Sequence, residues 1–272
     1  MFDAIHDALL RDLNPRISRD QWRRIFDYGW DRCQDYVGHA LVDGGVPVGF
    51  VGLIFANVPI AGRLERFCNV TSWTVRESHR ARALSLVMPL LKLRDHTITN
   101  LTAIPQVHTI FAQLGFGDLE THTTVLSAMP PLTSSCRGVT IITDPNEIAP
   151  HLGADERHIL EAHRGYTKHL LIRARDRNCY VVYTRGRRRK LPSAKVHYLG
   201  DEAVFAENVR TLQMHLLLRQ GLYLIEFDSR LLTRPIPFSR AIPLPVPRQY
   251  RSATLKPREV TNLFSEVVLL NF

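Results

Sequence analysis

The sequence lacks the cysteine and histidine patterns of metal-binding and disulfide-rich proteins. Its four cysteines, Cys33, Cys68, Cys136 and Cys179, lie far apart, with no C-x-x-C pair and no histidine at ligand spacing. We therefore expect free thiols in a reducing cytoplasm and no metal site.

Long apolar runs and a secretory leader are also absent. No apolar run approaches the length that would span a membrane. The opening, M-F-D-A-I-H-D, has acids where a secretory signal needs a basic region followed by an apolar core. These absences predict a cytoplasmic protein without a membrane span.

Positive charge is in excess: 35 lysines and arginines face 26 acids, for a net charge of +9. Such a balance favours an anionic partner, such as a nucleotide cofactor, a nucleic acid or a lipid surface, but a basic solvated surface explains it equally well. The densest run, R-G-R-R-R-K at 185–190, has the composition of a nucleic-acid patch. Because it lacks interleaved aromatic residues and falls in an expected hairpin loop, we favour a solvated loop.

Two domains are expected, over 1–130 and 131–272, because Pro130-Pro131 and the four residues after them are typical of a linker. In the first domain the glycines Gly49 and Gly52 predict a bulge or a close backbone approach within a strand. The elements expected there are helices at 2–13 and 18–32, strands flanking the hairpin signal at 43–45, a strand at 66–75, a helix to about 92, a strand at 97–103, a helix from Pro105, and a strand at 119–128.

The second domain repeats the order of helix, paired strands, helix and strand without visible sequence repetition, so a duplicated fold with one degenerate copy is open. The elements expected there are a strand followed by a helix from Pro145, strands at 178–184 and 194–199, a helix at 202–219, a strand at 222–228, an extended proline-rich tail at 235–247, and an apolar segment at 260–270 that docks on the body.

The basic turn at 76–85 is the feature that points to function. It links the strand that ends at Val75 to a helix in which Leu84, Val87, Met88 and Leu91 recur at helical spacing. A strand that passes through small residues into a helix exposes the free N–H groups of the first helical turn. Those groups and the helix dipole can bind phosphate, and arginines at the rim add charge.

This stretch resembles the GNAT acyltransferase superfamily, over about 18–128. The signature turn of that superfamily reads V-x-x-x-[Tyr/His]-R-[Gly/Ala]-x-[Gly/Ala]-[Ile/Leu]-[Gly/Ser], and its later hallmark is an aromatic residue, three residues and Gly-Phe. The matching positions are Val75, His79, Arg80, Ala81, Arg82, Ala83, Leu84 and Ser85 for the turn, and Phe111, Gly115 and Phe116 for the hallmark, after Pro105 at a helix start.

The resemblance implies an α/β (α+β, GNAT-like) fold, with a mixed, mostly antiparallel sheet flanked by helices and a second similar half. It also implies acetyl-CoA or another acyl-CoA as co-substrate and direct attack by an amine or hydroxyl of a small-molecule acceptor. The N–H groups of Arg80, Ala81, Arg82, Ala83, Leu84 and Ser85 would hold the coenzyme A pyrophosphate. The strand end Trp73, Thr74 and Val75 would pair with the pantetheine arm, and Phe111 would lie beside it.

Two departures from the family pattern leave a second interpretation open. The tyrosine that many members use as an acid is Phe111 here, and alanine and serine replace the glycines of the turn. The chain could therefore be a divergent enzyme or a non-catalytic binding or scaffold protein on the same fold. Nucleic-acid binding is a third and weaker interpretation, and a homo-oligomer is compatible with the sequence.

Three residues are candidates for proton transfer. Glu65 lies upstream on the strand that carries the turn, although a glutamate beside Arg63 and Arg66 is more often part of a surface ion pair. His79 and His108 could each act near neutral pH. A lone histidine is more often structural, so both interpretations stay open.

Overall fold

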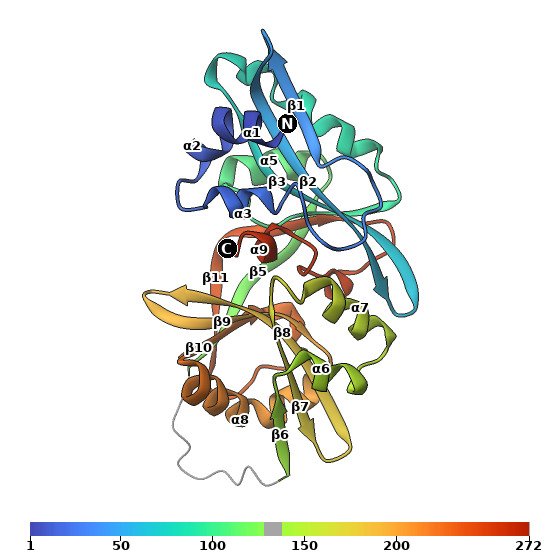
Figure 1. The fold of residues 1–272 in the computed structure, drawn as a ribbon, viewed down its shortest axis with the longest axis vertical. Helices are drawn as coiled ribbons and strands as arrows, with labels where there is room; N and C mark the ends of the chain where they lie inside the picture. The colour runs from blue at the N-terminus through green and yellow to red at the C-terminus, as the bar shows by residue number, and fades with distance from the viewer. Residues whose placement is uncertain (128–137, 272) are drawn as a thin grey trace. The chain divides into compact units, whose positions relative to one another are not determined.

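The computed structural model of the protein describes residues 1–127 and 138–271. It divides into two compact units, which we call unit 1 (Met1–Leu119 and Val246–Leu270) and unit 2 (Glu120–Pro245 with Asn271). The chain thus returns to unit 1 after unit 2, whereas the sequence predicted one boundary near 130. That predicted linker lies outside the described residues. Figure 1 shows the elements in chain order.

Unit 1 contains a mostly antiparallel sheet in the order β1-β2-β3-β4-β11, with β3 and β4 parallel. Its strands are β1 (Gly38–Asp43), β2 (Val46–Ile60), β3 (Arg63–Val75), β4 (His96–Asn100) and the end of β11 (Ser239–Arg251). Its helices are α1 (Phe2–Ile5), η1 (His6–Leu10), α2 (Arg11–Leu13), α3 (Arg19–Arg23), η2 (Glu77–Arg82), α4 (Leu84–Val87), η3 (Met88–Lys92), α5 (Pro105–Gln113), η6 (Pro257–Glu259) and α9 (Glu266–Leu269).

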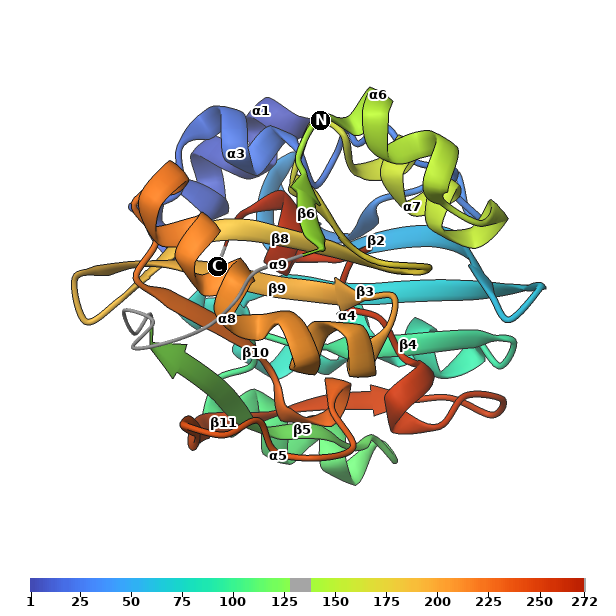
Figure 2. The ribbon, with the colours of Figure 1, turned by 90° about the horizontal axis from the view of Figure 1, so that it is seen from below.

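Unit 2 repeats this plan in the order β5-β10-β9-β8-β7-β6, with β9 and β10 parallel (Figure 2). Its strands are β6 (Val139–Ile142), β7 (Lys168–Ala174), β8 (Arg177–Arg188), β9 (Leu191–Leu199), β10 (Leu224–Asp228) and most of β5 (Gly117–Ser127). Its helices are α6 (Pro145–Ile148), η4 (Ala149–His151), α7 (Ala154–His163), α8 (Glu202–Gln220) and η5 (Ser229–Leu231).

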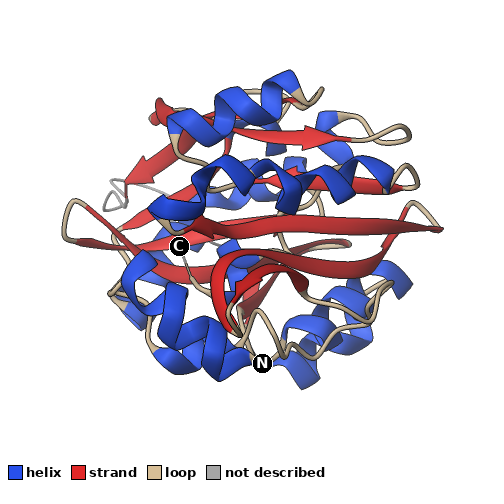
Figure 3. Cartoon of the chain, turned by 90° about the horizontal axis from the view of Figure 1, so that it is seen from above, coloured by secondary structure: helices blue, strands red, loops and turns tan. Residues whose placement is uncertain are grey.

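The two units therefore have the same core connectivity, a meander of three antiparallel strands, a helical crossover and a parallel strand. In each unit an antiparallel strand from the other half of the chain pairs with that parallel strand: β11 with β4, and β5 with β10. Helices accompany the strands in both units (Figure 3). The predicted fold class and the predicted similarity of the two halves are confirmed.

Local sequence explains where many elements begin and end. The first hairpin turns at Gly44 and Gly45, whose φ angles of 53° and 80° suit a type I′ turn. Ser18 caps α3 in a reciprocal capping box with Gln21. In α8, Asp201 accepts from Val204 N–H at 2.9 Å, and Gly221 ends the helix at φ 66°.

Strand β2 is buried from Val48 to Ala56 without alternation because elements pack on both of its faces. On one face, Leu53 and Phe55 belong to a core with Leu86 and Leu90 of α4 and η3. On the other, Phe50 stacks on Phe26 at 5.5 Å between ring centroids. Burial on both faces gives the long apolar run that the sequence shows.

Several expectations about elements were wrong. The helix at 18–32 ends at Arg23, and β7 was not expected. Most of the basic run at 185–190 continues β8, with the turn at Arg189 and Lys190. The tail at 235–247 is extended as expected, but from Ser239 it forms part of strand β11, which pairs with β4 from Gln249, opposite Asn100 at the end of β4.

The helix after the basic turn also differs from the prediction. Its buried side chains are Leu86, Val87 and Leu90, whereas Leu84 and Met88 are exposed. After β3 the chain forms a 3-10 helix from Glu77, and it becomes 3-10 again at Met88. Because a 3-10 helix has three residues per turn, a 3.6-residue period placed Val87 correctly on the buried face but misplaced Leu84 and Met88.

Candidate functional site

The candidate site lies where two parallel strands of unit 1 part. β3 and β4 pair from Arg66–His96 to Asn69–Thr99. β4 then ends at Asn100, whereas β3 runs on to Val75. Residues 70–75 of β3 therefore lie beyond the pairing with β4. Backbone groups on such a strand edge can pair with an extended ligand.

A β-bulge shapes the free end of β3. Phe50 pairs with Thr74 and Gly52 with Thr71, so Ser72 and Trp73 together oppose the single Val51. Ser72 has a φ of 54°, in the left-handed region that a serine rarely adopts. Bulges of this kind redirect side chains and occur often beside active sites.

Close packing across the bulge requires glycine. A Cβ at Gly52 would lie 2.8 Å from Cγ2 of Thr71, and one at Gly49 would lie 3.1 Å from Cγ2 of Val75. The prediction of a bulge or close backbone approach at these two glycines is confirmed.

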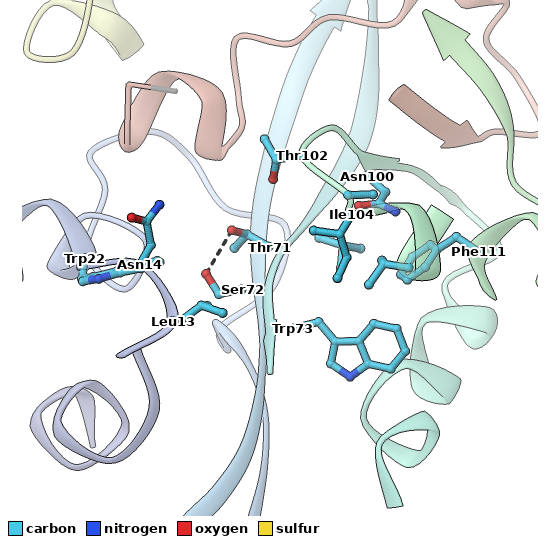
Figure 4. A pocket seen from close by; sticks show the side chains of 13 residues that line it. Leu13, Asn14, Trp22, Thr71, Ser72, Trp73, Asn100, Thr102, Ile104 and Phe111 are labelled. Atoms are coloured by element: carbon cyan, nitrogen blue, oxygen red, sulfur yellow. Dashed lines mark hydrogen bonds between the residues drawn. The ribbon is translucent and has the colours of Figure 1, made fainter. Parts of the chain in front are cut away.

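A cavity of about 370 Å³ opens beside the parting strands. Its size suits a small-molecule site. In Figure 4 Leu13, Asn14 and Trp22 lie to the left, Thr71 and Ser72 lie at the centre below Thr102, and Asn100, Ile104, Phe111 and Trp73 lie to the right. The lining residues are Leu13, Asn14 and Trp22, then Val70, Thr71, Ser72 and Trp73, then Asn100, Thr102, Ala103, Ile104, Val107 and Phe111.

The lining is apolar with a few polar groups that could fix a ligand. The Thr71 and Ser72 hydroxyls lie 3.2 Å apart and bond to each other. The indole N–H groups of Trp22 and Trp73 are buried without a hydrogen-bond partner. A buried donor without a partner costs free energy, so a ligand acceptor at either indole would be stabilising.

Buried amides link the strands near the cavity. Asn69 of β3 donates to Thr99 Oγ1 of β4 at 3.1 Å, at the last pair before the two strands part. Asn100 of β4 donates to Gln249 Oε1 of β11 at 3.2 Å. Gln249 in turn donates to the backbone oxygen of His108 at 3.1 Å, which ties α5 to β11.

One ionisable group lies behind the cavity wall. Glu266, the first residue of α9, is fully buried and accepts a hydrogen bond from the cavity residue Thr102 at 2.9 Å. Burial raises the pKa of its carboxyl to about 7, and the hydrogen bond from Thr102 opposes that rise. Perturbed carboxyls beside cavities are candidates for proton transfer.

Two of the sequence-predicted cofactor residues line this cavity. Trp73 and Phe111 pack edge to face at 6.0 Å between ring centroids, and Phe111 also packs on Phe116 at 4.9 Å. Thr74 and Val75 follow on the same strand, paired with Phe50 and Gly49 of β2. The structure thus brings the predicted strand residues and Phe111 together.

The predicted phosphate seat has a different local structure from the one expected. η2 already begins at Glu77, and Ala83 N–H donates to Arg80 O at 3.0 Å. Leu86 N–H donates to Ala83 O at 3.2 Å, and the Ser85 hydroxyl donates to Arg82 O at 2.7 Å. Arg80–Ser85 therefore lie inside a helical run, not at its start. Alanines favour helix where glycines would delay it, which explains the early start.

The three predicted proton-transfer residues are outside the residues that line the cavity. Glu65 accepts from Thr254 Oγ1 at 3.0 Å and lies 3.7 Å from Arg63. His79 Nε2 lies 3.0 Å from Asp43, and His108 Nε2 lies 2.9 Å from Asp118. Their catalytic roles stay predictions, and each has the ion-pair or hydrogen-bond partner that the structural interpretation requires.

Sequence reasoning missed Thr102, Ser72 and Glu266. The left-handed backbone of Ser72, with a φ of 54°, cannot be predicted from sequence, because serine rarely adopts it. Glu266 does carry one, since it is the single charged residue in the apolar run L-F-S-E-V-V-L-L. A lone carboxylate within a buried segment marks either a structural anchor or a functional group.

Two properties bear on the class of site. Among residues 1–127 and 138–271, no three His, Cys, Asp or Glu residues gather in a group that could hold a metal ion. Within the same ranges, no helix has the length and apolarity needed to cross a membrane.

Comparison by sequence identifies no relative. No protein-family model matches the chain, and no curated protein sequence matches it.

Comparison by structure identifies several similar folds. Eis1 from Mycobacterium abscessus aligns with a TM-score of 0.51 and 14% identity, over 92% of this chain and 70% of that one. A probable N-acyltransferase from Enterococcus faecalis, described as a conserved protein of unknown function, aligns with a TM-score of 0.57 and 10% identity, over 94% and 71% of the two chains.

A GCN5-related N-acetyltransferase from Anabaena variabilis aligns with a TM-score of 0.51 and 10% identity, over 78% of this chain and 61% of that one. Since the first two similarities span more than nine-tenths of this chain, they include both units. The chain has the fold of the GCN5-related N-acetyltransferases, as the resemblance in its sequence predicts.

Proposed function

We propose that the protein is an acyltransferase that moves an acyl group, acetyl in the simplest case, from coenzyme A to an amine or hydroxyl of a small molecule. The observation that carries this proposal is the parting of β3 and β4 beyond Asn69–Thr99, with a cavity beside the free end of β3. The pantetheine arm of coenzyme A is extended and carries two amides. An arm of this kind can pair with a free strand edge.

The cavity chemistry supports a thioester and a small acceptor. Trp73 and Phe111 offer apolar surface to the pantetheine and acyl carbons. The lining also includes Ser72, Thr102 and Asn14, whose hydroxyls and amide can orient a polar acceptor. We place the acceptor on this side, within unit 1.

The phosphates of coenzyme A would meet the basic segment after β3. Arg80 and Arg82 have exposed side chains there, and Arg80 has only a distant ion pair with Glu77 at 3.8 Å. Because backbone N–H groups such as that of Ala83 are already bonded within the helix, we propose that the guanidinium groups supply most of the phosphate contact.

The reaction needs no covalent enzyme intermediate. The acceptor nitrogen or oxygen attacks the thioester carbon, the C–S bond breaks, and coenzyme A leaves as a thiolate that takes a proton from water. A bulge leaves its extra residue unpaired in the ladder. We propose that a backbone N–H at Ser72 or Trp73 polarises the thioester carbonyl, since charge develops on that oxygen.

The test compares one exposed aliphatic residue in each unit. Ile104 lines the cavity and Leu218 lies on α8, and both are exposed, at 59% and 72%. We expect I104E to weaken acetyl-CoA binding by at least about tenfold in calorimetry, a loss of about 1.4 kcal/mol, and L218E to leave it unchanged. Absence of binding by the unmodified protein would disprove the proposal, as would equal affinity in all three proteins.

A second candidate function is acyl-CoA binding without turnover. Phe111, at the position where many family members have a tyrosine acid, is fully buried, and its ring has no proton to give. This candidate predicts calorimetric binding of acetyl-CoA with no release of coenzyme A above the spontaneous rate, across a panel of amines. Acceptor-dependent release would exclude it.

We further propose that the reaction takes place in the cytoplasm. The described cysteines, Cys33, Cys68 and Cys179, are all free thiols, as expected in a reducing compartment. Measurement of the protein in cell fractions would check this.

A further inference from the structure

Glu266 is a buried carboxyl that the fold alone does not explain. Its side chain is fully inaccessible, while Val267, Val268 and Leu269, which come after it in α9, are apolar and buried. An ionised carboxylate in such a place is costly unless donors surround it. One of its two oxygens, Oε1, accepts from Thr102, and the other, Oε2, has no hydrogen-bond partner.

The elements packed against Glu266 bring few charges to it. Asn69 of β3 accepts from the Glu266 backbone N–H at 3.0 Å and is neutral. Arg248 of β11 is the charged group whose field reaches the carboxyl and lowers its pKa. Arg24, directly after α3, donates to the backbone oxygen of Leu269 at 3.5 Å, at the far end of α9.

Burial outweighs these effects, so the carboxyl titrates near neutral pH, with a pKa of about 7. A proton acceptor works best when its pKa lies near the working pH, because both of its forms are then accessible. Above pH 7 the carboxylate form prevails.

Thr102 connects this carboxyl to the cavity. It lies in the short segment between β4 and α5 and is exposed, whereas Glu266 is sealed. Its hydroxyl donates to Glu266 and lines the cavity, where Figure 4 shows it above Thr71 and Ser72. A hydroxyl can donate one proton and accept another at once, so Thr102 can relay a proton that Glu266 cannot reach directly.

We propose that Glu266 receives the proton of the attacking acceptor through the hydroxyl of Thr102. This inference rests on the proposed acyltransferase function, and it names the carboxyl that accepts the proton of the attacking nucleophile. Thr102 contacts the acceptor, and Glu266 acts through Thr102 from behind the cavity wall.

The protons and bonds balance in one step. As the acceptor nitrogen or oxygen bonds to the thioester carbon, its proton passes to Thr102 Oγ1, and the hydroxyl proton of Thr102 passes to Glu266. The C–S bond breaks and its electron pair leaves with the sulfur. Glu266 is then neutral, and it returns its proton to water through the same hydroxyl after the acyl product leaves.

Hydrolysis of acetyl-CoA tests the relay without a known acceptor, because water then serves as the nucleophile. The readout is the pH dependence of coenzyme A release between pH 5.5 and 9, an experimental range set about the pKa of about 7. We expect the unmodified protein to gain rate through about pH 7. We expect E266Q, which keeps the shape and the Thr102 bond, to lose about 100-fold at high pH and to lose this rise.

Two substitutions of Thr102 separate relay from packing. T102V keeps the shape without the hydroxyl, and T102S keeps the hydroxyl. We expect T102V to match E266Q and T102S to retain most of the activity together with the pH rise. An unchanged rise in E266Q, or equal activity in T102V and T102S, would overturn the inference while leaving the acyltransferase function intact.

Binding and infrared measurements distinguish the remaining outcomes. Failure of the unmodified protein to bind acetyl-CoA in calorimetry overturns both the function and the relay. If E266Q does not fold, infrared difference spectra of the unmodified protein should show a carboxylic acid band that is lost near pH 7. That midpoint should rise in T102V, because the bond that stabilises the carboxylate is gone, and an unmoved midpoint would overturn the relay.

Discussion

Units 1 and 2 share one strand plan but differ in the length of strand that continues beyond the parallel pairing. In unit 1, β3 runs six residues past its last pair with β4, from Val70 to Val75. In unit 2, β9 runs three residues past its last pair with β10, from His197 to Leu199. The free strand edge beside the cavity is thus longer in unit 1.

A bulge occurs at the corresponding place in both units, on the strand that also pairs with the parallel strand. Ser72 and Trp73 oppose one residue of β2, and His197 is the extra residue of β9 between the pairs Tyr183–Val196 and Val182–Tyr198. Such bulges bend a strand and increase its local twist.

The side chains beyond the two bulges are satisfied in different ways. In unit 2, His197 bonds Thr184 at 2.9 Å, and Tyr198 donates to Glu156 at 3.4 Å. In unit 1, the indole N–H of Trp73 has no hydrogen-bond partner. The comparison teaches that the polar side chains at a bulge can bond within their own unit, as in unit 2, or leave a donor for a ligand, as Trp73 does in unit 1.

The largest expected effect comes from removing one core ring in each unit. Phe111 and Phe205 are both fully buried, and Phe205 packs on Phe227 at 5.8 Å between ring centroids. F111A and F205A should each lower the free energy of unfolding by about 3–5 kcal/mol, measured by urea denaturation. Only F111A should also weaken acetyl-CoA binding in calorimetry at 10 °C, a temperature chosen to keep both variants folded. Equal loss of binding would place the cofactor site outside unit 1.

The next effect is a pair of pH dependences with opposite signs. Burial raises the pKa of Glu266 to about 7 from an ordinary 4.5, so the folded state binds the proton more tightly than the unfolded state. Stability is then full below about pH 4.5 and falls as the pH rises towards 7. The loss is about 3 kcal/mol, and E266Q should remove it.

His169 of unit 2 behaves in the opposite way. Burial lowers its pKa to about 4 from 6.5, and its Nδ1 lies 2.7 Å from the Tyr180 hydroxyl. The folded state therefore holds the neutral ring. Stability is full above about pH 6.5 and falls by about 3 kcal/mol as the pH drops towards 4. Urea denaturation of H169Q and E266Q across this range checks both slopes, and a shared slope would contradict the separate assignments.

The smallest effect concerns backbone strain in the β8–β9 hairpin. Lys190 has a φ of 74°, which costs a residue with a side chain about 1 kcal/mol relative to glycine. K190G should raise the thermal midpoint by a few degrees. Its acetyl-CoA affinity should not change, because the hairpin belongs to unit 2. Reduced affinity would show that the basic run takes part in cofactor binding.

Much of the fold follows from local sequence. The 43–45 turn, the Ser18 cap, Pro145 and Gly221 each act within a few residues, so their signals survive in any tertiary context. The predicted bounds of an element were wrong where contacts with residues distant in the sequence decide where that element ends. The helix after Ser18 stops at Arg23, although Trp22 and Ile25 are both buried.

By itself, the sequence determined the GNAT-like order of elements, the two similar halves, and the presence of Trp73 and Phe111 at the site. The order of elements depends on period, caps and turn residues, which act locally, whereas Trp73 and Phe111 were implied by the family resemblance. Only the tertiary structure decided that β3 and β4 part beyond Asn69. It also decided that β11, late in the chain, pairs with β4 of unit 1, and that β5, early in the chain, pairs with β10 of unit 2. It also placed Glu266 behind Thr102, 164 positions apart in the chain. Contacts between residues so distant in sequence depend on how whole elements pack, and no local pattern carries that information.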